Sequence, residues 1–97
     1  MSSITITAIL TAKPGREQQL YQELIQVITP SRREDGCIEY SLHQSLANNA
    51  TFVFYETWES EEALASHIES EHYNRYRQNT ETLVEKREVY RLQKVDI

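Results

Sequence analysis

The stretch Thr51–Trp58 reads TFVFYETW, and it decides which fold this chain can adopt. β-Branched and aromatic residues dominate it, which predicts a strand. Side chains alternate between the two faces of a strand. One face carries Phe52, Phe54, Glu56 and Trp58, and the other carries Val53, Tyr55 and Thr57. Because both faces are apolar, something must cover each side of the sheet. We expect helices on one side and a second subunit on the other.

A second strand is predicted just before this stretch, where residues 37–46 read CIEYSLHQSL. One face of that strand carries Ile38, Tyr40, Leu42 and Gln44. Asn48 and Asn49 tolerate positive φ and indicate a turn, so the two strands should form a hairpin. His43 lies on the opposite face from Tyr40, which means that the two side chains cannot line the same pocket.

The N-terminal part of the chain predicts one strand followed by helix. Residues 3–12 alternate apolar residues with threonine at period two, which indicates a strand. Residues 15–28 repeat apolar side chains every three or four positions, which indicates a helix. We expect Pro30 to interrupt that helix, with Thr29 as a new N-cap and a short helical turn over residues 31–34.

The C-terminal part predicts two more helical segments and a last strand. Ser60 is a good N-cap for a short helix that extends to about Ile68. Ser70 can cap a further segment that extends to about Arg87, and residues 88–95 alternate weakly, as an edge strand does. The order βαββαβ predicts an α+β, ferredoxin-like antiparallel sheet with helices on one face.

Composition limits the function classes. A chain of 97 residues has room for a single domain over residues 1–97. The net charge of -5 and the scattered basic residues argue against a nucleic-acid partner. The single cysteine, Cys37, allows no intrachain disulfide, and no apolar run approaches the roughly 20 residues that span a bilayer. We therefore expect no membrane association and a cytoplasmic location.

Four short patterns follow one another in the order of a known family. They are Lys13-Pro14-Gly15, Glu34-Asp35-Gly36-Cys37 leading into Tyr40, Tyr55-Glu56-Thr57-Trp58-Glu59-Ser60 with Glu62-Ala63-Leu64, and His67 through His72-Tyr73. From about Ile4 to Val95 the chain resembles the antibiotic biosynthesis monooxygenase (ABM) family, and in particular its quinol monooxygenase-like members. No single pattern is specific, but four in the right order on the right elements are.

The resemblance implies an assembly and a class of reaction. Members of the family are typically homodimers whose sheets pack face to face as a dimeric α/β-barrel, with a pocket between sheet and helices in each subunit. Characterised monooxygenases of the family are oxidoreductases that oxidise phenols or quinols with dioxygen and without metal or flavin. Related members degrade haem, and others handle small signalling molecules.

Two residues are the candidates for catalysis, His67 and Glu56. His67 falls on the apolar face of its helix, where a histidine is either a hydrogen-bonded core residue or, with its neutral-range pKa, a proton acceptor. Glu56 shares a strand face with Phe54 and Trp58, so its carboxylate must be paired or have a raised pKa, as a general base does. The structural alternative for Glu56 is a bond to Arg or Tyr across an interface.

Five residues are the candidates for substrate binding: Trp58, Phe54, Tyr40, His72 and Tyr76. Trp58 either stacks on a flat substrate or anchors the end of its strand. His72 either caps its helix or points into the pocket mouth, and Tyr76 either donates a hydrogen bond to a substrate oxygen or only packs. Tyr40 is chosen through the family pattern.

No metal or other cofactor is predicted. His43, His67 and His72 contain no i, i+4 pair, so a two-histidine site would require distant parts of the chain to converge. Haem-degrading members of the family depend on an asparagine of the first strand with a tryptophan and a histidine of the second helix. This chain has no asparagine from Met1 to Ala12, and the matching helix positions hold His67 and Arg77. Haem oxygenation is therefore not expected.

Two hypotheses remain open at this point. The first is a cofactor-independent monooxygenase that oxidises a quinol or similar small aromatic with dioxygen, with His67 or Glu56 removing a phenolic proton. The second is a dimeric pocket protein that binds or isomerises a small metabolite without oxygen chemistry. The missing asparagine of the first strand favours the second, and the resemblance favours the first.

Overall fold

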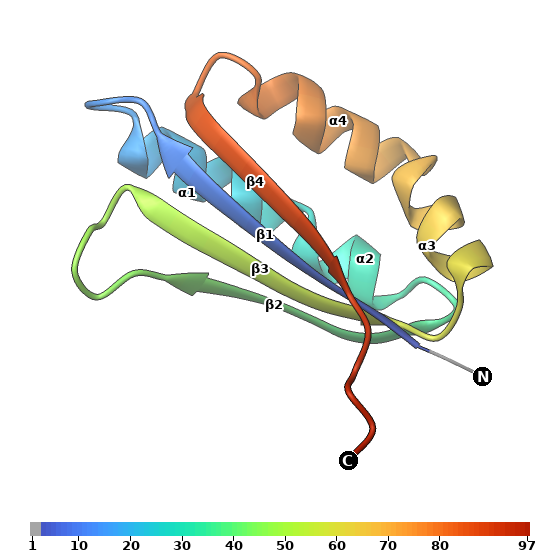
Figure 1. The fold of residues 1–97 in the computed structure, drawn as a ribbon. Coiled ribbons are helices and arrows are strands. Elements are labelled where there is room, and N and C mark those ends of the chain that lie inside the picture. The colour runs from blue at the N-terminus through green and yellow to red at the C-terminus, as the bar shows by residue number, and fades with distance from the viewer. Residues whose placement is uncertain (1–2) are drawn as a thin grey trace.

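The computed structural model describes residues 3–97 and has one four-stranded antiparallel sheet with helices on one face (Figure 1). The elements are β1 (Ile4–Ala12), α1 (Glu17–Gln26), α2 (Ile28–Arg32), β2 (Cys37–Gln44), β3 (Thr51–Trp58), α3 (Glu61–Ile68), α4 (Glu71–Thr80) and β4 (Val84–Leu92). The strand order is β2-β3-β1-β4. The predicted α+β, ferredoxin-like fold is confirmed.

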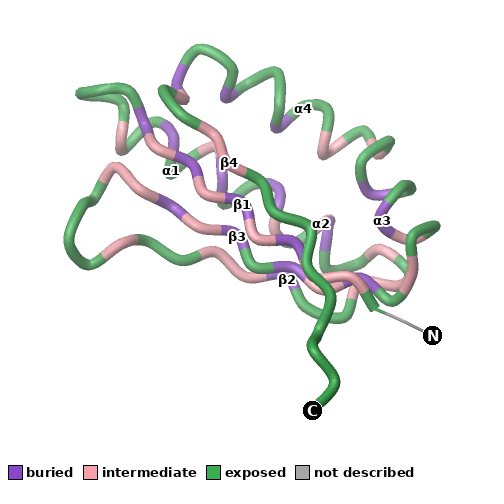
Figure 2. The backbone as a smooth tube through the Cα atoms, viewed as in Figure 1, coloured by how far each residue is buried: buried purple, intermediate pink, exposed green. Residues whose placement is uncertain are grey.

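The core lies between the helices and one face of the sheet. Alternate residues of β1 and β3 are buried, which Figure 2 shows as regularly spaced purple segments. On the helix side they meet Leu20 and Leu24 of α1, Leu64 of α3 and Tyr76 of α4. The face of β3 that carries Phe52, Phe54, Glu56 and Trp58 is the one that the helices cover, a choice that the two-sided apolar pattern had left open.

The other face of the sheet bears no helix. Tyr55 of β3 is 39% exposed on it, and Tyr90 and Leu92 of β4 are 48% and 44% exposed. Ile9 and Val53 are partly buried on the same face, each surrounded by neighbouring strands. This face, which we call the open face, therefore combines large apolar side chains with threonines.

The prediction that Pro30 interrupts the first helix was wrong. Val27 both ends α1 and begins α2, and α2 continues through Thr29 and Pro30 to Arg32. Pro30 is the third residue of α2, in the first turn, where a missing N–H is tolerated because backbone donors there have no helical acceptor. Thr29 therefore lies within the helix and does not cap it.

The boundary between the last helix and the last strand was also predicted too late. α4 ends at Thr80, and β4 begins at Val84, four residues before the predicted start. Pairing with β1 along its length, up to Ala12 opposite Val84, overrides the weak helical pattern of residues 81–87. β4 then ends at Leu92 and not at residue 95.

The alternation predicted that Ile38 shares a face of β2 with Tyr40, and this prediction was wrong. Cys37 pairs with Trp58 and Glu39 with Thr57, so Ile38 is the extra residue of a β-bulge and is 61% exposed. A bulge shifts the alternation by one residue, which a period-two pattern does not reveal.

None of the helices within residues 3–97 is long and apolar enough to cross a bilayer.

Candidate active site

A cavity of about 100 Å³ lies between the sheet and helices α3 and α4. Its apolar lining comes from Ile6, Ala8, Leu64, Ile68 and Val89. Its polar lining comes from Glu56, His67, Tyr73, Tyr76, Arg87 and Arg91. Three of the seven predicted site residues, Glu56, His67 and Tyr76, therefore meet at one cavity in the predicted place. Its lining, mostly apolar with a few converging polar groups, is that of a small-molecule site, while its volume is below the roughly 300 Å³ at which such sites usually begin.

His67 lies in the last turn of α3 with 1% of its surface exposed. Ser60 caps that helix by accepting a hydrogen bond from the Ala63 amide, which fixes the direction in which His67 points. The His67 ring stacks on Trp58, with ring centroids 4.5 Å apart and planes inclined by 30°. Its edge is held by Tyr73, whose ring centroid is 5.0 Å away. The imidazole is thus rigidly placed.

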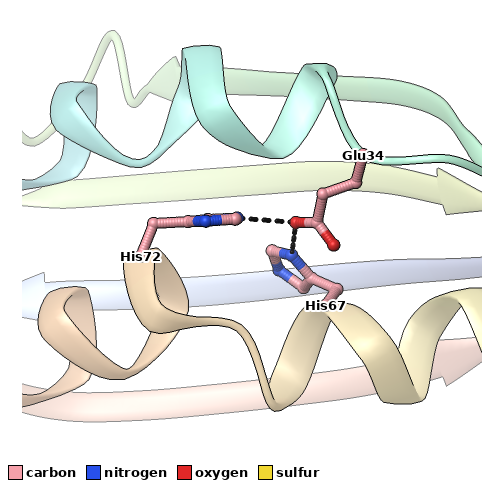
Figure 3. Close-up of side chains that lie close together, drawn as sticks. All are labelled: Glu34, His67 and His72. Atoms are coloured by element: carbon pink, nitrogen blue, oxygen red, sulfur yellow. Dashed lines mark hydrogen bonds and ion pairs between the residues drawn. The ribbon is translucent and has the colours of Figure 1, made fainter.

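Glu34 determines the tautomer of His67. The distance from His67 Nδ1 to Glu34 Oε2 is 2.7 Å, and because a carboxylate only accepts, Nδ1 carries the hydrogen (Figure 3). Burial lowers the pKa of His67, and the hydrogen bond to Glu34 opposes that effect. The neutral ring therefore presents the lone pair of Nε2, which is buried and has no hydrogen-bond partner.

The loop after α2 brings Glu34 against α3. Gly36 in this loop has a φ of +85°, and a Cβ atom there would lie 2.6 Å from the Cβ of Ala63. Only glycine permits both the backbone conformation and the close approach. The loop is also joined to the end of β3, since the Glu59 amide donates to the Gly36 carbonyl at 2.8 Å.

His72 lies in the first turn of α4 and points toward Glu34 (Figure 3). Its Nε2 is 2.6 Å from the same Oε2 atom that accepts from His67, so both imidazoles donate to one oxygen. His72 is half-buried and is not part of the cavity lining. Its predicted alternatives were a cap and a place in the pocket mouth, whereas Ser70 caps α4 and His72 bonds Glu34.

Glu56 lies on the buried face of β3 with 6% of its surface exposed. The indole N–H of Trp58 donates to Glu56 Oε1 at 3.0 Å, and His67 Nε2 lies 4.0 Å from the same oxygen. Burial raises the pKa of Glu56 to about 7, although the Trp58 hydrogen bond and the Arg87 charge oppose the rise. The Glu56 carboxyl can therefore take up or release a proton near neutral pH.

Tyr40, Phe54 and Trp58 form an aromatic layer that is fully buried behind the cavity. Tyr40 contacts Phe54, Trp58 and His67, with ring centroids 5.3, 6.2 and 5.5 Å away. None of the three belongs to the cavity lining. Trp58 thus acts on the site through other residues, by donating to Glu56 and by supporting His67.

Two cations line the cavity: Arg91 is paired with Glu61 at 2.7 Å, whereas Arg87, which the sequence reasoning missed, has no such pair. Its Nη2 donates to the Tyr73 hydroxyl at 3.3 Å, while its Nε is buried without a hydrogen-bond partner. Within residues 3–97, no carboxylate forms an ion pair with Arg87. No carboxylate contacts this half-buried guanidinium, although its charge acts on Glu56 from a greater distance, and an anionic ligand would offset the cost of burying it.

The sequence reasoning also missed Glu34 and Tyr73. Both lie within the patterns that carry the family resemblance, so a signal was present, but neither was assigned a role. Arg87 carried no such signal, because it was placed at the end of a helix and not on β4.

Glu34, His67 and His72 offer ligand atoms that lie within 4.8 Å of one another. The absence of an i, i+4 histidine pair in the sequence had spoken against a two-histidine site. In the fold, α3, α4 and the loop after α2 converge on one point and bring His67 and His72 to the same carboxylate.

The geometry combines three groups that suit proton removal from a weak acid. His67 Nε2 is an oriented base, Glu56 is a second carboxyl group beside it, and Arg87 is a cation that can stabilise a developing anion. Each depends on the surrounding packing to keep its position and its protonation state.

A family model described as antibiotic biosynthesis monooxygenase matches residues 3–79. The Mycobacterium tuberculosis protein named "Putative monooxygenase Rv0793" is 37% identical over 76 residues, which cover 78% of this chain and 74% of that protein. The uncharacterised Synechocystis protein sll1783 is 26% identical over 83 residues, which cover 86% of this chain and 56% of that longer protein.

Two solved structures match the fold closely. PA3566 from Pseudomonas aeruginosa has a TM-score of 0.95 and 32% identity, covering 99% of this chain and 97% of its own. The structure of Rv0793 has a TM-score of 0.92 and 32% identity, covering 99% and 98%. The family match, the identity to Rv0793 and the common fold agree, and the chain belongs to the antibiotic biosynthesis monooxygenase family.

Proposed function

We propose that this protein is a cofactor-independent monooxygenase that oxidises a quinol or a similar small aromatic with dioxygen. The observation that carries the proposal is the pairing, in one cavity, of an oriented neutral base, His67, with an unpaired cation, Arg87. Membership of the ABM family supports the reaction class. The quinol substrate is what the resemblance to quinol monooxygenase-like members implies, and the acid–base groups of the cavity suit it.

The first step is removal of a phenolic proton. His67 Nε2 accepts it, since Nδ1 is already protonated and donates to Glu34, which stabilises the imidazolium that forms. The phenolate charge that remains is stabilised by the Arg87 guanidinium and by the hydroxyl groups of Tyr73 and Tyr76. Glu56, whose pKa is raised to about 7 by burial, can relay the proton onward from His67.

The second step transfers electrons from the phenolate to dioxygen. One oxygen atom is inserted into a ring C–H bond and the other leaves as water. The quinol supplies all four electrons and becomes a hydroxyquinone, so no separate reductant is required. In this scheme the protein contributes positioning, proton transfer and charge stabilisation, while Tyr40, Phe54 and Trp58 keep the base in place.

We also propose that two copies associate through the open face, as a dimeric α/β-barrel. The exposed Tyr55, Tyr90 and Leu92 support this, because monomeric proteins rarely expose large apolar patches. We place the enzyme in the cytoplasm, a proposal that the single free cysteine, Cys37, supports.

Oxygen consumption with a panel of quinols tests the proposed reaction. We expect uptake above autoxidation for at least one quinol, with one atom of labelled dioxygen in the product. His67→Gln should lower the rate by about 100-fold or more, because general-base catalysis contributes about that much. His43→Gln, on the exposed end of β2, is the matched control. Uptake no faster than autoxidation for every quinol would contradict the proposal.

The second candidate is a pocket protein that binds or isomerises a small metabolite. The observation that favours it is the placement of two groups that accept protons, His67 and Glu56, 4.0 Å apart, since an isomerisation moves a proton without using oxygen. A metabolite that raises the melting temperature and is interconverted under argon would point to this function.

A further inference from the structure

We propose that Glu34, His67 and His72 form a binding site for a divalent transition-metal ion such as Zn²⁺. The ligands would be one carboxylate oxygen of Glu34, Nδ1 of His67 and Nε2 of His72. This inference does not rest on the proposed oxygenase activity, and it concerns the side of His67 that faces away from Glu56.

The three ligand atoms already converge. Both imidazole nitrogens aim at Glu34 Oε2, at 2.7 and 2.6 Å (Figure 3). Ligands about 2 Å from one Zn²⁺ ion lie roughly 3.3 Å from each other, so these contacts would open only slightly around an ion. Histidine pairs with one carboxylate are a common ligand set for Zn²⁺, with water in the remaining position. Imidazole ligands disfavour Ca²⁺ and Mg²⁺, which prefer oxygen.

The unpartnered nitrogen of His67 is an independent observation that points to a metal. With the hydrogen on Nδ1, the buried Nε2 has no hydrogen-bond partner. If Nδ1 instead coordinates an ion, the hydrogen moves to Nε2, which faces the Glu56 carboxyl at 4.0 Å. The Glu56 carboxyl lies on the side from which a carboxylate typically orients a metal-binding histidine, although 4.0 Å is beyond hydrogen-bond distance. Metal binding at Nδ1 would thus place a hydrogen-bond donor opposite the Glu56 carboxyl, and a shift of about 1 Å by either side chain would bring the two within hydrogen-bond distance.

The surroundings of the site allow an ion to enter and be held. His72 and Glu34 are only partly buried, so an ion can approach from the α4 side, whereas His67 is fully buried. Gly36 and the Ser60 and Ser70 caps fix the three segments that supply the ligands. The site is therefore supported by packing and not assembled from mobile side chains.

A bound ion and the proposed base exclude each other. When Nδ1 coordinates a metal, Nε2 carries the hydrogen and cannot accept a proton from a substrate. The binding experiment is therefore performed without substrate, so that its result does not depend on whether the protein is an oxygenase.

Zn²⁺ titration of the tag-free chain, stripped with a chelator and followed by calorimetry, tests the site. We expect one ion per chain for the wild type and for His43→Gln, and at least about tenfold weaker binding for His72→Gln and Glu34→Gln. These glutamines retain polarity at partly buried positions, and circular dichroism in chelator checks that both variants fold. No saturable binding by the wild type, or equal binding by His72→Gln, would overturn the proposal.

The imidazole nitrogen resonances give a second readout that a purely structural role would not change. In chelator, we expect His67 to carry its hydrogen on Nδ1. Added Zn²⁺ should move that hydrogen to Nε2 and shift the His72 resonances, leaving His43 unaffected. Zn²⁺ that shifts only His43 would show binding elsewhere and overturn the assignment.

Discussion

Two carboxylates with different surroundings act on one imidazole. Glu34 accepts hydrogen bonds from His67 and His72 at the partly exposed end of the site, whereas Glu56 is buried beside Trp58. Burial raises the pKa of Glu56 to about 7, and Glu34 contributes to that rise through its own negative charge. These different surroundings allow a base, His67, and an acid, Glu56, to lie side by side at neutral pH.

Replacing Glu56 by glutamine should change how stability depends on pH. The pKa of Glu56 rises from 4.5 to about 7 on folding, so the folded state binds more protons between these values. The contribution of Glu56 to the free energy of unfolding, about 3 kcal/mol, is fully present below pH 4.5 and is lost as the pH rises through about 7. Glutamine keeps an acceptor for the Trp58 N–H and has no charge.

Urea unfolding at pH 5 and pH 8 measures this difference. We expect the free energy of unfolding to fall more between the two pH values in the wild type than in Glu56→Gln. Glu62→Gln, at an exposed position of α3, is the control and should behave like the wild type. An equal fall in all three proteins would contradict the raised pKa of Glu56.

Replacing Arg87 should weaken ligand binding while changing the stability of the fold little. Its guanidinium has no carboxylate partner within residues 3–97, and its Nε is buried without a hydrogen bond. Arg87→Met removes the buried charge at the cost of the bond to Tyr73, a loss of about 1 kcal/mol that the removed desolvation cost offsets. We expect stability within about 1 kcal/mol of the wild type and at least tenfold weaker binding of an anionic aromatic.

Thermal unfolding and ligand titration check the two parts of this prediction. Lys86→Met, on the exposed neighbouring position of β4, is the control for removal of a positive charge. Strong destabilisation with unchanged ligand affinity would mean that Arg87 has a structural role only.

At the scale of elements, the site is assembled by segments that are far apart in the sequence. The loop after α2 supplies Glu34, β3 supplies Glu56, α3 supplies His67 and β4 supplies Arg87. The close approach of that loop to α3 at Gly36 keeps Glu34 within hydrogen-bond distance of His67. An error in the position of this loop would separate the base from the group that orients it.

Gly36→Ala should therefore disturb the fold and the site together. The new Cβ would lie 2.6 Å from Ala63 Cβ, and φ of +85° is unfavourable for alanine. Gly15 is a matched control, because its φ is +81° and nothing lies within 4 Å of a Cβ there. Gly15→Ala should cost about 1 kcal/mol for the backbone conformation alone, and Gly36→Ala about 1 to 3 kcal/mol more.

Urea unfolding of the two variants measures these costs. Ala63→Gly in the Gly36→Ala background should restore part of the stability, since it removes the atom that clashes. Equal stability of the two alanine variants would mean that the loop can move away from α3 without penalty.

Some of the elements could be predicted from the sequence alone, and others could not. The pattern of Thr51–Trp58 correctly predicted a strand with helices on one side and Glu56 on the face of Phe54 and Trp58, but not which face the helices cover. Alternation did not reveal the bulge at Ile38, because a bulge adds one residue without changing the residue types. The start of β4 was missed because pairing with β1 outweighs local propensity.

The candidate site was predictable in part for a related reason. His67, Glu56 and Tyr76 were found, since polar residues within an apolar pattern are visible in the sequence. Glu34 and Arg87 act through contacts with residues 33 and 14 positions away, and such contacts depend on the three-dimensional arrangement. No pattern of spacing indicates that two histidines five residues apart will share one carboxylate.

At the scale of the whole molecule, the sheet has one covered face and one open face. Tyr55, Tyr90 and Leu92 lie on the open face at 39%, 48% and 44% exposure. The hydroxyl of Tyr90 donates to Glu88 on the same face, so the surface has both apolar and polar character. Its contact with a second copy would bury these side chains and increase the stability of a short chain.

Tyr55→Glu should weaken self-association through this face. A buried, unpaired carboxylate costs at least about 3 kcal/mol, so we expect the dissociation constant of the dimer to rise at least 100-fold.

Tyr21→Glu is a closely matched control, because Tyr21 is also 39% exposed but lies on α1, on the helix side of the sheet. Sedimentation velocity should give about twice the chain mass of 11.4 kDa for the wild type and for Tyr21→Glu, and a shift toward the single chain for Tyr55→Glu. A wild-type chain that sediments as a monomer would contradict the proposed dimer, and equal weakening by the two glutamates would place the contact on the helix side. The cavity lies on the helix side of each subunit, away from the open face. Dissociation of the dimer should therefore leave the tautomer of His67 unchanged. A Tyr55→Glu chain that still folds should keep its Zn²⁺ affinity.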